Sequence, residues 1–106
     1  MKSEIRLDIQ LDENKVPESI HWTAEDGGIV NDPAQAILLS LWDDRTQDTL
    51  RIDLWTKDMG IDNMKRFYHQ TLLSMADSYQ RATDEKEMAD DLRDFARYFA
   101  EKQKGV

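Results

Sequence analysis

Two histidines, His21 and His69, are the only candidates in this sequence for general acid–base catalysis near neutral pH. His21 alternates with Ile20 and Trp22, which predicts that it lies on the outer face of a strand. His69 falls on the polar side of a predicted helix. Neither has a serine, a cysteine or a glycine elbow beside it that could supply a nucleophile. We therefore interpret both as structural or surface residues and predict no catalytic residue.

Acidic side chains that could bind a metal ion gather in two predicted turns. One turn holds Asp43, Asp44 and Asp48, and in the other Glu25 and Asp26 precede two glycines. Neither matches the calcium loop with its distal glutamate, and the sequence has no H-E-x-x-H motif and no cysteine. Phosphate-binding glycine motifs are also absent from the sequence. We predict no metal and no cofactor, and interpret the turn acids as solvated.

The stretch from Ala36 to Met59 reads as two strands joined by a polar turn from Asp43 to Asp48. Pairing Asp43 with Asp48 places Leu39 beside Ile52 and gathers six aliphatic side chains on one side of the hairpin, whereas a slip of one residue would scatter them. We call this side the aliphatic face; it consists of Ile37, Leu39, Leu41, Leu50, Ile52 and Leu54.

The opposite side of this hairpin, which we call the tryptophan face, has an unusual composition for a surface. It consists of Ala36, Leu38, Ser40, Trp42, Thr49, Arg51, Asp53 and Trp55. Tryptophan and arginine are the residues that most often anchor protein interfaces. We predict that Trp42, Arg51, Asp53 and Trp55 bind a partner. The alternative is that residues Glu25–Gln35 fold back and cover this face.

Two further strands precede the hairpin. Residues Ser3–Leu11 alternate between apolar and polar side chains, and a second strand is predicted over Pro17–Ala24. Closing the turn between them with Leu11 opposite Val16 sets Leu7 against Ile20. Residues Glu25–Gln35 carry consecutive turn signals, and we predict a loop there; a short helix capped by Asp32 before Pro33 is the alternative.

After Thr56 the apolar period changes from two to about 3.6, which predicts two helices. Asp62 is the predicted N-cap of the first helix, with Asp58 as an earlier alternative, and Asp84 with Glu87 resembles a capping box for the second. Gly105 can end the second helix. The apolar stripes, predicted to be core, are Met64, Phe67, Tyr68, Thr71, Leu72, Met75, Ala76 and Tyr79, then Met88, Leu92, Phe95, Ala96 and Phe99.

This order of elements predicts an α+β fold, a four-stranded antiparallel meander followed by two C-terminal helices packed on one face. The 106 residues suit a single domain spanning 1–106, and 40% hydrophobic residues are enough for a globular chain. The net charge of −8 disfavours nucleic acid and anionic lipid as direct ligands. The N-terminus lacks the apolar region of a signal peptide and no segment is long and apolar enough to insert in a membrane, so we expect a cytoplasmic protein.

Longer motifs add a family resemblance. The chain resembles the gliding motility protein GldC family of Bacteroidetes, from about Glu4 to Glu101. Members often have proline at the position of Gly60, which concerns the start of the first helix. The segments that carry the likeness are Ala24–Gly28, Leu39–Asp43, Thr49–Met59, Met64–Phe67, His69–Leu72, Met75–Asp77 and Arg81–Thr83.

The resemblance implies a small soluble accessory protein associated with gliding motility, with no accepted catalytic residue or cofactor. Two hypotheses for its molecular role follow. The first is a non-enzymatic module that binds a protein partner, or a second copy of itself, through the tryptophan face. The second is a small enzyme or ligand-binding domain with a pocket between sheet and helices that uses His69, Tyr68 or Asp58.

Overall fold

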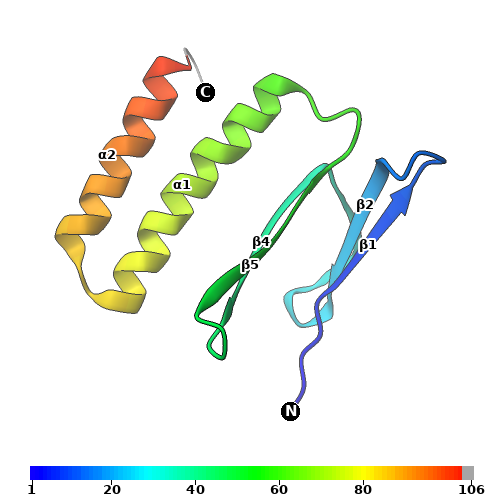
Figure 1. The fold of residues 1–106 in the computed structure, drawn as a ribbon, viewed down its shortest axis with the longest axis horizontal. Helices are drawn as coiled ribbons and strands as arrows, with labels where there is room; N and C mark the ends of the chain where they lie inside the picture. The colour runs from blue at the N-terminus through cyan, green and yellow to red at the C-terminus, as the bar shows by residue number, and fades with distance from the viewer. Residues whose placement is uncertain (104–106) are drawn as a thin grey trace. The chain divides into compact units, whose positions relative to one another are not determined.

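The computed structural model describes residues 1–103 of the chain (Figure 1). The fold is α+β, as predicted, and the chain divides into two compact units, Met1–Met59 and Gly60–Val106. The single domain over residues 1–106 and the packing of both helices on one face stay predictions. The elements are β1 (Arg6–Leu11), β2 (Pro17–Ala24), the 3₁₀ turn η1 (Glu25–Gly27), β3 (Ile29–Ala34), β4 (Ala36–Asp43), β5 (Asp48–Trp55), α1 (Ile61–Thr83) and α2 (Lys86–Lys102).

The first unit contains two antiparallel sheets, one with the order β1-β2-β3 and the other formed by β4 and β5 (Figure 1). The predicted four-stranded meander is therefore wrong, because the segment assigned to a loop contributes a fifth strand. β3 pairs with β2, with Ala34 opposite Ile20 and Pro33 opposite His21. Proline has no N–H to donate, and it is tolerated here because β3 is the edge of its sheet.

The register of β1 on β2 differs by two residues from the prediction. Leu7 pairs with Trp22, not Ile20, and Ile9 takes the place opposite Ile20. The Asp12 carboxylate accepts the N–H groups of Asn14 and Val16 and closes the turn, and a bulge between Gln10 and Leu11 precedes this turn. A shift of two residues keeps every side chain on its predicted face, because side chains alternate with a period of two.

The β4–β5 hairpin has the predicted register throughout, from Ala36 opposite Trp55 to Asp43 opposite Asp48, so that Leu39 lies beside Ile52. Its turn is closed by Asp43, whose carbonyl accepts the N–H of Gln47 at 2.9 Å. The Asp43 carboxylate also accepts the N–H of Arg45 at 3.0 Å. The two faces defined from the sequence are thus the two faces of the observed hairpin.

Backbone hydrogen bonds fix the end of this hairpin to the first sheet. The N–H of Thr56 donates to the carbonyl of Gln35 at 2.9 Å, and the N–H of Lys57 donates to the carbonyl of Pro17 at 3.1 Å. Thr56 is buried, and its hydroxyl donates to the carboxylate of Asp58. These bonds give the first unit its internal order, since a two-stranded hairpin by itself is only marginally stable in water.

Both predicted helix starts need correction. α1 has Gly60 as its N-cap, and Asp62 lies in the first turn, where its charge still suits the positive end of the helix dipole. Asp84 is not a capping-box residue of α2: it ends α1 in the left-handed conformation, with its N–H donating to the carbonyl of Gln80. Glu85 is the N-cap of α2. The predicted helix end at Gly105 lies outside the described residues.

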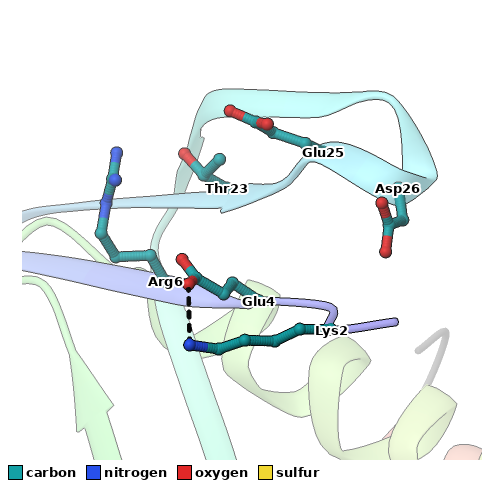
Figure 2. Close-up of a pocket in the computed structure, with 6 residues that line it drawn as sticks. All are labelled: Lys2, Glu4, Arg6, Thr23, Glu25 and Asp26. Atoms are coloured by element: carbon teal, nitrogen blue, oxygen red, sulfur yellow. Dashed lines mark ion pairs between the residues drawn. The ribbon is translucent and has the colours of Figure 1, made fainter.

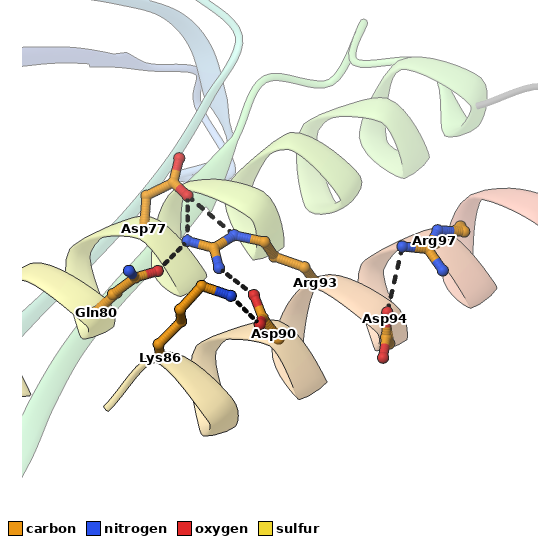
Figure 3. Close-up of polar contacts among 7 residues, drawn as sticks. All are labelled: Asp77, Gln80, Lys86, Asp90, Arg93, Asp94 and Arg97. Carbon is orange, nitrogen blue, oxygen red and sulfur yellow. Dashed lines mark hydrogen bonds and ion pairs between the residues drawn. The ribbon is translucent and has the colours of Figure 1, made fainter. Parts of the chain in front are cut away.

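The two helices run side by side (Figure 1), and Arg93 of α2 reaches polar side chains of α1 (Figure 3). Ala76, Ala89 and Ala96 are fully buried. The guanidinium of Arg93, on the same side of α2 as Ala89 and Ala96, donates to Asp77 at 2.9 Å and to Gln80 at 2.7 Å on α1. Close approach of the helices at alanines therefore places a charge-assisted hydrogen-bond network across their contact.

The contact between α1 and α2 leaves one broad side of this helical pair apolar. Successive residues are 100° apart around a helix, so Arg93, Asp77 and neighbouring charged residues lie on one side, and most of the long apolar residues lie on the other. The predicted core stripes are therefore not buried between the helices. Four of their residues stay about half exposed, namely Tyr68, Met75, Met88 and Phe95.

The core of the described chain is small. Ile20, on the central strand of the first sheet, is the largest side chain that is fully buried, with 1% of its surface exposed. It lies between Ile9 on β1 and Ala34 on β3. Several large apolar side chains of the first unit keep much of their surface in solvent, and those on the β4–β5 hairpin are Leu41, Trp42, Leu50, Ile52 and Trp55.

Candidate functional site

The tryptophan face of the hairpin is the site that the structure exposes most clearly. Trp42 is 62% exposed and Trp55 is 52% exposed. The register places Trp55 opposite Ala36 at one end of the face and Trp42 opposite Thr49 at the other. The two indole rings therefore lie at diagonally opposite corners, with one on each strand.

An ion pair lies between these corners. The guanidinium of Arg51 donates to the carboxylate of Asp53 at 2.9 Å, and both side chains are accessible to solvent. Arg51 and Asp53 are two residues apart on β5 and so point to the same face. An exposed pair of this kind contributes little to folding stability. The face thus combines two aromatic anchors with one positive and one negative charge.

The alternative that residues Glu25–Gln35 cover this face does not hold in the structure. Those residues form η1 and β3, and β3 pairs with β2. The N–H of Asn31 donates to the Thr23 hydroxyl at 3.0 Å, which holds the segment against the first sheet. Both tryptophans remain exposed, so no part of the first unit covers them. All four predicted partner-binding residues are brought together on one surface.

The aliphatic face of the same hairpin is also partly exposed. Leu41 and Leu50 are each 54% exposed, and Ile52 is 49% exposed. The hairpin therefore presents apolar side chains on both faces, which is unusual because antiparallel sheets normally have one polar face in water. Exposed apolar patches of this kind commonly mark interaction surfaces.

A polar hollow of about 230 Å³ lies between the N-terminal residues and η1, and it has no features of a binding site (Figure 2). It is lined by Lys2, Glu4, Arg6, Thr23, Glu25 and Asp26. Lys2 and Glu4 form an ion pair at 3.6 Å, and both side chains are largely exposed. The buried Thr23 hydroxyl already accepts the N–H of Asn31. The hollow therefore holds solvated charges of both signs.

A second polar cluster joins the β1–β2 turn to the segment after β5. The ammonium group of Lys57 lies 2.7 Å from the carboxylate of Asp12 and 3.6 Å from that of Glu18. The hydrogen bond from Lys57 lowers the pKa of Asp12, and the same bond raises the pKa of Lys57. The backbone bond from Lys57 to Pro17 lies beside it. We interpret this cluster as structural, since it fixes a turn.

Neither this cluster nor the Arg93 network was predicted from the sequence. The sequence did contain a signal for the Arg93 network. Ala89 and Ala96 flank Arg93 on one side of α2, and small residues on one side of a helix permit close helix packing. Arg93 also donates to Asp90 at 2.8 Å, and Lys86 lies 2.7 Å from the same carboxylate (Figure 3). The hydrogen bond from Lys86 is the main cause of the lowered pKa of Asp90.

The residues of the enzyme hypothesis are not brought together within either unit. Asp58 belongs to the first unit, whereas Tyr68 and His69 lie on α1 in the second. His21 lies on β2, between Asp8 of β1 and Pro33 of β3. Across residues 1–103 the side chains form no group of three or more His, Cys, Asp or Glu that could hold a metal ion.

These observations define the class of protein. It is a small acidic α+β protein with an exposed aromatic surface on a β-hairpin, and no helix among residues 1–103 is sufficiently long and apolar to span a membrane.

Comparison with known protein families identifies the family of this chain. Residues 17–105 match the family described as gliding motility-associated protein GldC-like, and the chain belongs to this GldC-like family. The match covers most of the chain and includes the whole hairpin and both helices. No curated protein and no solved structure matches the chain.

Proposed function

We propose that this gliding motility-associated chain is a non-enzymatic interaction module that acts in the cytoplasm and binds a protein partner through the tryptophan face. The observation that carries the proposal is the pair of tryptophans, 62% and 52% exposed, on one face of a hairpin whose register is fully defined. Interface hot spots are enriched in tryptophan and arginine, and this face has both.

The charged groups of the tryptophan face support the choice of surface. The Arg51–Asp53 pair would give a partner geometric and charge specificity in addition to apolar area.

The test compares partner binding with stability in matched variants. Trp55→Ala should weaken capture of a partner by about 30-fold, which corresponds to the loss of about 2 kcal/mol typical of a hot-spot residue. Because Trp55 is already half exposed, its truncation should reduce folding stability by less than the 3–5 kcal/mol usual for a buried aromatic residue. Leu50→Ala is the matched control, since Leu50 is 54% exposed on the opposite face.

The measurement is affinity capture from the native cell with each variant as bait, followed by mass spectrometry, beside thermal melts of the same proteins. The proposal expects a protein that is retained by the wild type and by Leu50→Ala and is lost with Trp55→Ala. It is wrong if Trp55→Ala unfolds the chain, or if a folded Trp55→Ala retains every protein that the wild type retains.

A further inference from the structure

We infer that the tryptophan face binds the same face of a second copy of this chain, around a two-fold axis that crosses the strands at right angles. The inference rests on the proposed function, because it takes the same face as the binding surface. It adds the identity of the partner and the geometry of the complex. Both follow from how side-chain size and charge are distributed over the observed rows of the hairpin.

The tryptophan face consists of four cross-strand rows. Along the hairpin they are Ala36 with Trp55, Leu38 with Asp53, Ser40 with Arg51, and Trp42 with Thr49. Consider two such faces packed together about an axis that runs across the strands, midway between the second and third rows. The rotation places each strand over its own equivalent with the direction reversed, so that the first row faces the fourth and the second row faces the third.

This arrangement is complementary in size. Trp55 of one copy lies over Thr49 of the other, because both are on β5 in the first and fourth rows. Trp42 of one copy lies over Ala36 of the other, because both are on β4 in the fourth and first rows. Each large ring therefore meets a small side chain, and the symmetry repeats both contacts. Facing sheets pack about 10 Å apart with interdigitated side chains, and large-over-small pairing is what permits this.

The arrangement is also complementary in charge. Arg51 in the third row of β5 lies over Asp53 in the second row of the other copy, and the symmetry repeats the pair. Together with the observed pair at 2.9 Å within each chain, the two arginines and two aspartates form a ring of alternating charge near the axis. Rotation of the two sheets by about 30°, common in such packing, displaces these central rows least.

The other face-to-face two-fold axis, parallel to the strands, does not pair the charges. It places Arg51 over Ser40 and Asp53 over Leu38 of the second copy, because each row then faces itself with the strands exchanged. Asp53 would lose solvent against an aliphatic side chain without gaining a partner from the other copy, which is unfavourable. Charge therefore selects the axis that crosses the strands.

The size of the face indicates a weak dimer. Each strand of the hairpin has 8 residues, so the face is roughly 27 Å long and roughly 10 Å wide at the usual strand rise and spacing. This footprint is well below the ~800 Å² per partner of a standard stable interface, so we expect a dissociation constant in the micromolar range or weaker.

The experiment is sedimentation equilibrium of the full chain at one ionic strength, over concentrations from ~5 to ~500 μM, a range chosen to span a micromolar dissociation constant. The wild type should change from monomer to dimer. Arg51→Asp and Asp53→Arg should each weaken dimerisation by about tenfold or more, because like charges then face each other. Arg45→Asp is the matched control: it makes the same change of charge in the turn, outside the face.

Mixing the two variants tests the geometry itself. Arg51→Asp has two negative charges at these positions and Asp53→Arg has two positive ones, so an equimolar mixture should form a heterodimer although neither variant dimerises well alone. The double variant R51D/D53R should dimerise as the wild type does. Circular dichroism of each variant shows that it is folded.

Three results would overturn the inference: a wild type that stays monomeric throughout, an Arg51→Asp variant that dimerises like Arg45→Asp, or a mixture that stays monomeric. Failure of this inference is distinct from failure of the proposed function. A monomeric wild type that loses a captured protein on Trp55→Ala refutes the second copy as partner and leaves the proposed surface intact. A dimer that persists in Trp55→Ala and in the charge variants refutes both the geometry and the surface.

Discussion

Replacing Ile20 by alanine should destabilise the first unit by about 3–4 kcal/mol. Ile20 is 1% exposed, on the central strand of its sheet, between Ile9 and Ala34. The change removes three carbons, worth about 0.8 kcal/mol each in transfer free energy, and leaves a cavity that raises the loss further within the usual range of 2–5 kcal/mol. Ile20→Val should cost about 0.5–1.5 kcal/mol.

Urea unfolding followed by tryptophan fluorescence measures this loss. All three tryptophans, Trp22, Trp42 and Trp55, lie in the first unit, so the signal reports on that unit alone. The helices are followed separately by circular dichroism at 222 nm, where helical signal dominates. Ile5→Ala is the control, because Ile5 is 73% exposed, and it should change stability by less than about 0.5 kcal/mol. A loss below about 1 kcal/mol for Ile20→Ala would refute the reasoning that this residue is the centre of the core.

Three further outcomes are expected. Arg93→Met should lower the melting temperature of the helices more than Arg97→Met does, because Arg93 joins α2 to Asp77 of α1 whereas Arg97 pairs only within α2; equal shifts in circular dichroism melts would contradict this. Lys57→Met should lower the melting temperature at neutral pH. Because the pKa of Asp12 is lowered in the folded protein, the stabilisation from the Lys57–Asp12 pair is present above pH 3.8, the ordinary pKa of an aspartate. It is lost as the pH falls through the lower pKa of the folded protein, so the melting temperatures of Lys57→Met and the wild type should converge in acid. A constant difference in melting temperature down to about pH 2 would contradict this. Calcium or zinc should not raise the melting temperature, and a rise reversed by EDTA would contradict the predicted metal independence.

Local sequence determined the hairpin and the helical periods. The alternation on both sides of the Asp43–Asp48 turn admits one register that gathers all aliphatic side chains on one face, and the structure has that register. A register shifted by one residue would divide the aliphatic side chains between the two faces, so the hydrophobic pattern excludes it. For the same reason, the alternation alone is enough to assign the four partner-binding residues of the tryptophan face to one surface.

The first sheet was less predictable, and the period of two is again the reason. The register of β1 on β2 differs from the prediction by two residues, and a shift of two leaves every side chain on its own face. Apolar pattern alone cannot distinguish such registers. The choice depended on the Asp12 turn and on Pro17, which has no N–H for the ladder. β3 has turn signals and little alternation, and pairing with β2 decides its conformation.

The sequence by itself determined which side chains share a face, because face membership follows from periods of 2.0 and 3.6 along the chain. Only the tertiary structure decided which of those faces are covered. Burial depends on contacts between segments distant in sequence, and here small residues such as Ala76 and Ala89 are the ones buried in the helical pair. Trp42 and Trp55 stay in solvent because residues 25–35 pair with β2 and do not cover them. That exposure, which no local pattern encodes, makes the tryptophan face a candidate binding surface.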